Sequence, residues 1–415
     1  MSNFEIGSAV LCLAAAGGFL NTRIFRLPSA IGLMAISLFG SLVIVALGAA
    51  GWIDRSAIHA LVAQIDFADV LMHNLLGLLL FAGALHVDIT DLASNRLPIA
   101  ALALGGTLIS TVIVGLGTYF LMASLGLELS LAHAFLFGAL ISPTDPIAVL
   151  GILKSANAPE ELSIQISGES LFNDGVGVVL FVGISAVAGG AAVSAGEFAI
   201  LFAREALGGA MFGLGLGYLG FLLLRQIDDY SVEVLITLSM VLGGYAVAER
   251  LHLSAPIAAV VAGLVVGNQG RRVAMSDRTR QHVDMFWELL DEMLNAVLFL
   301  LLGLEATSLQ LTPAIALAAA LSIPLVLAAR FTSVGITISG LLLRRSFPRN
   351  AVTLLTWSGL RGGISVALAL SIPAGPVREA LLVMTYAVVA SSILVQGLSL
   401  RPALRWLGAV APARP

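Results

Sequence analysis

Two clusters of acidic and hydroxyl side chains interrupt long apolar stretches of this chain. The first cluster is Ser142-Pro143-Thr144-Asp145-Pro146, and the second is Gly168-Glu169-Ser170-Leu171-Phe172-Asn173-Asp174. Charges at membrane depth are costly, and they mark ion or proton pathways by default. Carboxylate, hydroxyl and carbonyl oxygens are also the ligands that a hard cation prefers. The two clusters therefore predict a site for a small cation, a proton or both.

The second cluster is expected on one face of a helix. Glu169, Ser170, Asn173 and Asp174 follow one another at i, i+1, i+4 and i+5, so a helix places them on the same side. If the helix begins near Glu160, a rise of about 1.5 Å per residue puts Asp174 roughly 20 Å along it, near the middle of a bilayer. Burial disfavours the charged carboxylate, so such a group can hold either a proton or a cation.

Asp174 is accordingly the expected exchange group, and Ser170 and Thr144 are expected to join it in holding Na⁺. Asn173 is expected beside them, where its amide can also simply brace the carboxylate or a helix end. Two structural alternatives stay open at this point. Asp174 can make a buried hydrogen bond between helices, and Ser170 can serve the same purpose as a polar contact between helices.

The first cluster predicts a break in its helix. Pro143 and Pro146 flank Thr144-Asp145, and proline removes a backbone donor and disfavours helix at the preceding residue. Backbone groups freed at membrane depth need a partner or a cavity. Asp145 can then face the positive end of a half-helix, and Thr144 can face a cation. The alternative is a simple proline kink without a role in binding.

Two arginines are expected to balance these acids. Arg361 lies between glycines in Gly359-Leu360-Arg361-Gly362-Gly363, where a guanidinium can neutralise the negative ends of broken helices. Arg330 lies inside an apolar segment, and we expect it, rather than Arg361, to pair with Glu169. Asp174 then keeps no arginine of its own. The alternative for Arg330 is a side chain that extends to the lipid interface.

Composition identifies the surroundings of these residues as a membrane. The chain is 59% hydrophobic and only 11% charged, whereas soluble domains average about 25% charged residues. Cys12 is the only cysteine, which excludes an intrachain disulfide and a thiolate metal site. There is no nucleophile–base pair, phosphate-binding loop or metal-ligand spacing, so we expect a transporter that is not an enzyme, has no cofactor and binds no nucleic acid.

The expected architecture is an all-α polytopic membrane protein with about 13 transmembrane helices. The predicted spans lie near 5–21, 29–50, 66–87, 98–123, 132–154, 162–189, 197–224, 231–250, 254–269, 285–305, 312–342, 350–371 and 377–399. With the N-terminus outside, fifteen Lys and Arg residues fall in inner loops and the tail, against three in outer loops. The C-terminus is then cytoplasmic.

Two stretches of the chain resemble each other. Residues 74–85 are similar to residues 295–304, and an interrupted span follows each at a similar distance. Since these spans differ by seven, the two halves must enter the membrane in opposite directions. Paired interruptions in inverted repeats indicate the binding site of a secondary transporter.

The two clusters, together with Trp357-Ser358-Gly359-Leu360-Arg361-Gly362-Gly363-Ile364, resemble the monovalent cation/proton antiporters of the NhaP/NHE type. The resemblance covers nearly the whole membrane region. It implies two inverted six-helix repeats, crossed unwound spans 5 and 12, and a homodimer in the bilayer. It also implies that Asp174 binds the ion, that Asn173, Thr144 and Asp145 complete the motif, and that Glu169 is structural. Members with asparagine before the aspartate generally exchange one cation for one proton.

The resemblance further implies a core domain of about 98–190 and 312–400, a dimerisation domain of about 1–97 and 197–305, and a short cytoplasmic tail at 401–415. The expected location is the plasma membrane, specifically a prokaryotic inner membrane, with a role in pH homeostasis. One departure from the family is Ala82, because many relatives carry an acid directly after the phenylalanine that corresponds to Phe81.

The sequence leaves the transported cation open between Na⁺ or Li⁺ and K⁺. A sodium-coupled symporter for an organic anion is the alternative of a different class. Glu288, Asp291 and Glu292 beside Trp287 are expected to form an interfacial cap or an inner vestibule.

Overall fold

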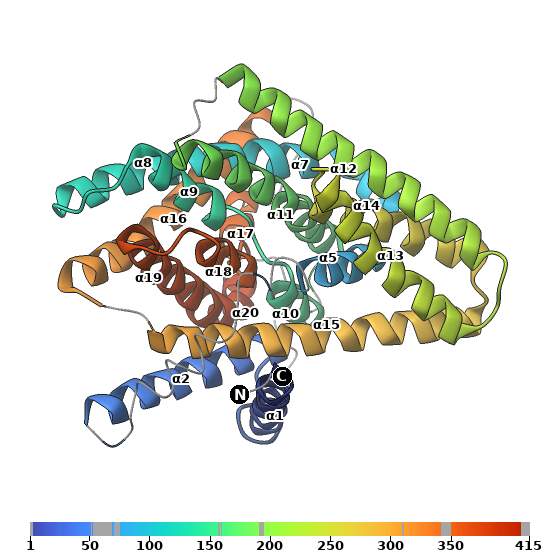
Figure 1. The fold of residues 1–415 in the computed structure, drawn as a ribbon, viewed down its shortest axis with the longest axis horizontal. Helices are drawn as coiled ribbons and strands as arrows, with labels where there is room; N and C mark the ends of the chain where they lie inside the picture. Colours follow the sequence, from blue (N-terminus) through green and yellow to red (C-terminus); the bar gives the residue numbers. More distant parts are fainter. Residues whose placement is uncertain are drawn as a thin grey trace.

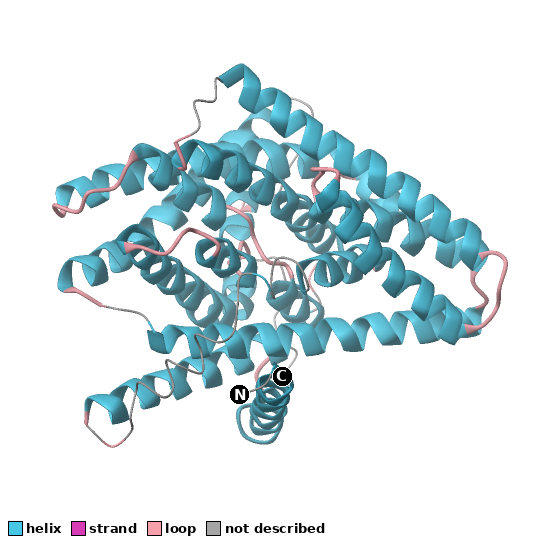
Figure 2. Cartoon of the chain, viewed as in Figure 1, coloured by secondary structure: helices cyan, strands magenta, loops and turns pink. Residues whose placement is uncertain are grey.

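The computed structural model describes residues 3–50, 52, 69, 75–156, 158, 160–190, 195–308, 311–341 and 350–407. All regular structure in these ranges is helical, as Figure 2 shows, which agrees with the predicted all-α class. The part of the third expected span before Leu75 lies almost wholly outside these ranges, and so does the tail after Leu407.

Helices occupy every expected span at the described positions (Figure 1). The helices are α1 (Asn3–Leu20), α2 (Ser29–Ala49), α5 (Leu76–Leu85), α6 (Ile89–Ser94), α7 (Arg96–Ala100), α8 (Thr107–Ser124), α9 (Leu131–Ile141), α10 (Ile147–Ala156), α11 (Glu160–Ala188), α12 (Ala195–Leu224), α13 (Tyr230–Arg250), α14 (Ala255–Val265), α15 (Asp277–Glu305), α16 (Pro313–Leu341), α17 (Ala351–Trp357), α18 (Gly363–Leu370), α19 (Pro376–Ser391) and α20 (Leu398–Trp406).

Short π-helical or 3-10 turns extend several of these helices, and two of them, η3 and η6, join consecutive helices without a loop. They are η1 (Asn21–Phe25), η3 (Ala101–Gly106), η4 (Val266–Ala274), η5 (Ala306–Ser308) and η6 (Ser392–Gly397). Helices α7 and α8 thus form one continuous rod through η3, and α19 and α20 form another through η6. The described part of the expected tail is therefore helical, and Leu404 within it is buried.

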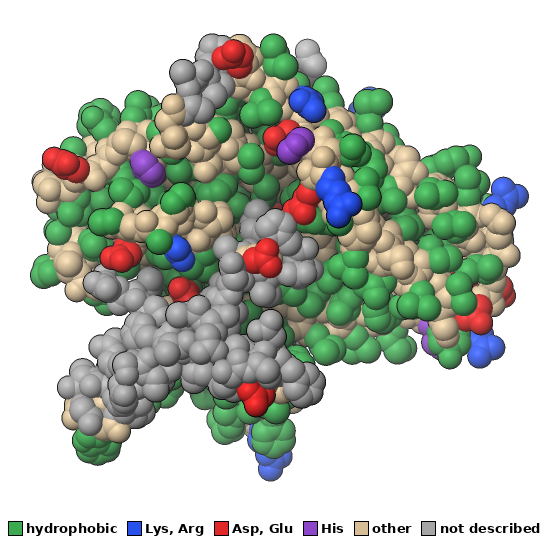
Figure 3. Space-filling view, in the orientation of Figure 1, with side chains coloured by type: hydrophobic (Ala, Val, Ile, Leu, Met, Phe, Trp, Pro, Cys, Tyr) green, Lys and Arg blue, Asp and Glu red, His purple; other side chains and the backbone are tan. Residues whose placement is uncertain are grey.

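Seven helical segments in the described ranges are long and apolar enough to cross a membrane. Leu207, Met211 and Leu214 are more than half exposed on α12, and Figure 3 shows apolar side chains over much of the visible surface. In water such a surface would be an aggregation hazard, whereas in a bilayer it is the lipid face. The chain is a multi-pass membrane protein, and the exact number of crossings stays a prediction.

Small residues allow α12 and α14 to approach closely. A Cβ atom on Gly213 would lie 2.5 Å from the Ala258 carbonyl oxygen, and one on Gly217 would lie 2.7 Å from the Val265 Cβ. Gly215 between them faces open space. The glycines that face α14 therefore serve helix packing.

Candidate ion-binding site

The two interrupted helices meet at their breaks. Helix α9 ends at Ile141 and α10 begins at Ile147, while α17 ends at Trp357 and α18 begins at Gly363. The backbone N–H of Asp145 donates to the Leu360 carbonyl at 2.8 Å, which joins the two non-helical segments directly. The prolines and glycines of these segments thus free backbone groups that pair across the two breaks.

The charged residues of the breaks face the helix ends. The Arg361 guanidinium donates to the carbonyls of Ser142 and Pro143, the latter at 2.7 Å, where α9 has just ended. The Asp145 carboxylate fills the space that a Cβ on Gly362 would need, directly before the first residue of α18. A cation at a helix C-terminus and an anion at a helix N-terminus both stabilise the helix, because each carries the charge opposite to that of the dipole at that end. Only glycine at position 362 leaves room for this arrangement.

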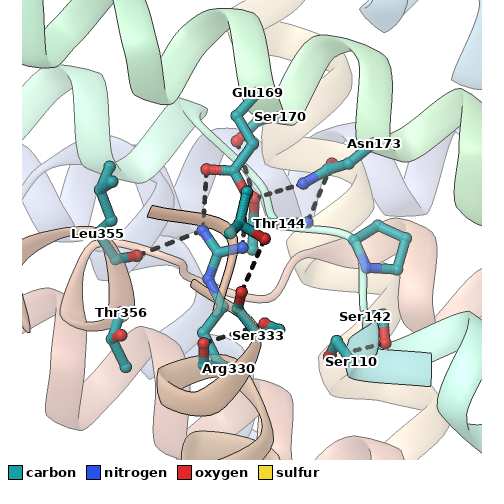
Figure 4. A network of polar contacts seen from close by, with 12 residues as sticks. Ser110, Ser142, Thr144, Glu169, Ser170, Asn173, Arg330, Ser333, Leu355 and Thr356 are labelled. Carbon is teal, nitrogen blue, oxygen red and sulfur yellow. Dashed lines mark hydrogen bonds and ion pairs between the residues drawn. The ribbon is translucent and has the colours of Figure 1, made fainter. Parts of the chain in front are cut away.

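Asn173 on α11 holds the first break in place (Figure 4). Its Oδ1 accepts from the Thr144 backbone N–H at 3.3 Å, and its Nδ2 donates to Thr144 Oγ1 at 2.9 Å. The same Thr144 hydroxyl lies 2.9 Å from the Ser170 hydroxyl. All three residues are buried. Both ends of the amide are used, so a carboxylate at position 173 would lose one of these hydrogen bonds.

Arg330 on α16 forms an ion pair with Glu169, and Figure 4 shows the two side chains face to face. Nη1 bonds to Oε1, and Nη2 bonds to Oε2 at 3.0 Å and to the Leu355 carbonyl at 3.3 Å. Arg330 is 4% exposed and Glu169 is 1% exposed, so Arg330 does not extend to the lipid interface. The pair connects α11, α16 and α17 through one buried guanidinium.

Asp174 lies one helix position beyond this network and faces a cavity of about 650 Å³. It is 5% exposed, and within the described ranges the structure records no ion pair or hydrogen bond to its side chain. Asp145, Ser167 and Leu171 line the cavity as well. Ser170, Thr144 and Asn173 do not line it, because their polar atoms are turned into the hydrogen-bond network.

Helix α15 forms the opposite wall of the cavity. Asp284, Glu288, Asp291 and Asn295 all line it, and their steps of four, three and four residues place them on one helix face. Trp287 is buried against Phe81, with ring centroids 4.8 Å apart, and donates to Thr237 Oγ1 at 3.1 Å. This anchor fixes the rotation of α15.

Glu288 and Asp291 are thus vestibule residues, whereas Glu292 is exposed and does not line the cavity. Asp284 and Asn295 are lining residues that the sequence reasoning did not identify, although their helical spacing from Glu288 and Asp291 was a readable signal. Ala82 also lines the cavity, so its methyl group occupies the wall where many relatives are expected to carry an acid.

Among the described residues, no group of three or more His, Cys, Asp or Glu side chains is arranged to hold a metal ion. Of the residues singled out in the sequence, Asp174 and Asp145 line the cavity. Ser170, Thr144 and Asn173 lie together in the hydrogen-bond network beside it. The structure places Glu169 with Arg330, and Arg361 at the first break. The roles of these residues in transport stay predictions.

Comparison with known proteins identifies relatives along nearly the whole chain. The sequence model of the transmembrane sodium/hydrogen exchanger family matches residues 8–406. The Na⁺/H⁺ antiporter NhaP of Pseudomonas aeruginosa is 49% identical over 421 aligned residues, which cover 98% of each chain. The Na⁺/H⁺ antiporter NhaH of Halobacillus dabanensis is 38% identical over 353 residues, which cover 83% of this chain and 84% of that one.

The fold has a solved counterpart. The structure of the sodium proton antiporter MjNhaP1 from Methanocaldococcus jannaschii superimposes with a TM-score of 0.75 at 21% identity. The match covers 97% of this chain and 98% of the other. At this identity the likeness concerns the fold, and it agrees with the all-helical architecture predicted from the sequence.

Proposed function

Because the chain belongs to the sodium/hydrogen exchanger family, a family of transporters and not of enzymes, we propose that it exchanges Na⁺ for H⁺ across a membrane. Li⁺ is the expected second substrate, and the exchange is one ion for one proton. The observation that carries the proposal is Asp174, a buried carboxylate that lines a large cavity and has no ion-pair partner within the described ranges.

The chemistry follows from the position of that carboxylate. Its charged form is costly in the membrane unless a cation or a proton accompanies it, so the two ligands compete for one group. The fixed neighbours support this competition, because Arg330 is engaged by Glu169 and Arg361 by backbone carbonyls. Asp145 and released backbone carbonyls at the breaks supply further oxygen ligands. Ser170 and Thr144 hold the break in shape, and they reach the ion only if the network opens.

Transport also needs access from both sides in turn. We assign the cavity in this structure to the cytoplasmic side, since the predicted inner loops carry the excess of basic residues. The core domain, residues 98–190 and 312–400, then carries the ion past a dimerisation domain, residues 1–97 and 197–305. This movement takes place in a homodimer whose N-terminus lies outside and whose C-terminus is cytoplasmic.

Proton flux in proteoliposomes tests the proposal. We expect Na⁺ and Li⁺ to discharge a pH gradient reported by a fluorescent dye, and we expect Asp174→Asn to abolish this response. Asp277→Asn is the matched control, because Asp277 is an aspartate on α15 whose side chain is 89% exposed. Full activity of Asp174→Asn would refute the assignment.

Two further readouts separate the alternatives. If protons and cations compete, the apparent KM for Na⁺ falls as the pH rises, because deprotonated Asp174 becomes available. A response to K⁺ alone would identify a K⁺/H⁺ exchanger of the same fold. A pH response that depends on an added organic anion would favour the symporter.

A further inference from the structure

We propose that the cavity contains a second cation-binding site, formed by Asp291 and Asn295 on α15, which holds the ion before it reaches Asp174. This inference rests on the proposed cation exchange and specifies a step of it. The ligand is a hard monovalent cation such as Na⁺, and its protein ligands are the Asp291 carboxylate and Asn295 Oδ1.

Asn295 supplies the first observation. Its side chain is 4% exposed and lines the cavity. Nδ2 donates to the Asp291 carbonyl at 2.8 Å, which settles the orientation of the amide. Oδ1 is then a buried acceptor without a hydrogen-bond partner within the described ranges. A buried acceptor left unpaired is costly, and a cation is one ligand that satisfies it.

The charge balance of the cavity supplies the second observation. Asp145, Asp174 and Asp291 line the same space, together with Asp284 and Glu288 nearer the mouth. No Lys or Arg is among the lining residues of the described chain, and the one basic group there is the imidazole of His86. Arg271 pairs with Asp284 at 2.5 Å, and within the described ranges the structure records no ion pair that would supply a counter-charge to Asp174 or Asp291. A mobile cation can supply that charge.

The order of the polar residues gives the direction of entry. Glu288 is exposed, Asp291 is half-buried and Asn295 is buried, so the row leads from the surface into the membrane. Asn295 lies about 16 Å from Asp284 along the helix axis at 1.5 Å per residue. The next lining residue of α15, Leu298, fills the space beside Gly363 at the start of α18. The row of polar residues on α15 therefore ends at an apolar side chain, and Asp291 and Asn295 are the two deepest residues in it that offer side-chain oxygens.

Asp291 and Asn295 lie across the cavity from α11, and this position lets them pass an ion on to Asp174. Ser167, Leu171 and Asp174 on α11 line the cavity at steps of four and three residues, so the two helices face each other with one polar wall each. An ion held on α15 needs only to cross the cavity to reach Asp174. Many relatives are expected to carry an acid on α5 where this chain has Ala82, and here Asp291 on α15 provides a carboxylate from the opposite wall.

Transport kinetics test the site. In everted vesicles, which expose the predicted cytoplasmic side, we expect Asp291→Asn to raise the apparent KM for Na⁺ about tenfold, as expected for the loss of one charged ligand, and excess Na⁺ to overcome the loss. Asn295→Ala should act in the same direction. Glu292→Gln is the matched control, because Glu292 is the exposed neighbour outside the cavity. An unchanged KM in Asp291→Asn would overturn the proposal.

Glu288→Gln distinguishes a localised cation-binding site from a general electrostatic attraction of cations to the acidic cavity. Glu288 lines the same wall, but it is exposed, so its loss should change KM much less than the loss of Asp291. An equal change in both variants would show only that negative charge attracts cations, and it would overturn the site. If the unaltered protein shows no cation-dependent proton flux, the proposed function itself fails, which is a different result.

Direct binding of ²²Na⁺ to the purified full-length chain gives an independent answer. Asp174→Asn removes the exchange group, and we expect this variant to keep one weaker Na⁺ site. Asp174→Asn/Asp291→Asn should lose that site, whereas Asp174→Asn/Glu292→Gln should keep it. No binding in the Asp174→Asn single variant, or equal binding in the variant that also lacks Asp291, would refute a second site.

Discussion

Removal of Glu169 should destabilise the protein through the charge that it leaves behind. In Glu169→Ala the Arg330 guanidinium stays buried without its carboxylate. The 3.0 Å contact between Nη2 and Oε2 corresponds to a Coulomb energy of about 5.5 kcal/mol at an effective dielectric constant of about 20. Measured losses on breaking buried pairs are about 3–5 kcal/mol, so both routes give the same scale.

The expected shift of the melting temperature is roughly 6–10 °C downward, taking about 2 °C per kcal/mol, the lower end of the range for large domains. Thermal unfolding in detergent, followed by tryptophan fluorescence at one scan rate, measures it. Trp287 is fully buried and serves as a reporter. Glu160→Gln, in the exposed first turn of the same helix, should melt within about 1 °C of the unaltered protein, since such surface charges contribute only tenths of a kcal/mol.

The double variant Glu169→Met/Arg330→Met decides the cause of the loss. Replacement of both partners by apolar side chains of similar volume is often neutral, because no buried charge remains. We therefore expect the double variant to recover most of the melting temperature lost in Glu169→Ala. Glu169→Gln fills the space and still strands the charge, so it should remain destabilised. Equal melting of the single and double variants would show that packing, not charge, causes the effect.

Three further changes test other parts of the site. Asn173→Asp removes the amide donor to Thr144 Oγ1, so yield and melting temperature should fall. Any residual transport should become voltage-dependent. Unchanged stability together with voltage-insensitive flux would contradict the tuned role of the amide. Gly362→Ala forces the Asp145 carboxylate to move, so exchange should drop at least tenfold, whereas Gly340→Ala, which has open space, should transport normally. Gly213→Leu should separate α12 from α14 and lower the melting temperature, and Gly215→Leu beside it should not.

The sequence was sufficient to predict the breaks and the all-helical class. Pro143 and Pro146, and the glycines around Arg361, are local signals, since proline and glycine act on their own backbone. The Glu169–Arg330 contact was also accessible, because few charges lie inside the spans and each buried charge requires a partner.

The hydrogen bonds of the site could not be read in the same way. Whether Asn173 contacts Thr144 depends on how α11 packs against the first break, and a separation of 29 positions along the sequence does not encode that distance. Ser170 and Thr144 were expected at the ion, yet they point into the network. The lining row on α15 was visible as a period, but the face it presents is determined by the packing of Trp287.

The size of the cavity determines where the transported ion must shed its solvent. A space of about 650 Å³ corresponds to some twenty water molecules at about 30 Å³ each, so an alkali ion can enter with its hydration shell intact. Li⁺, Na⁺ and K⁺ differ most in their free energy of dehydration, and entry into the cavity does not require dehydration. Discrimination between them therefore belongs to the steps inside the cavity, where protein oxygens replace the waters of the hydration shell.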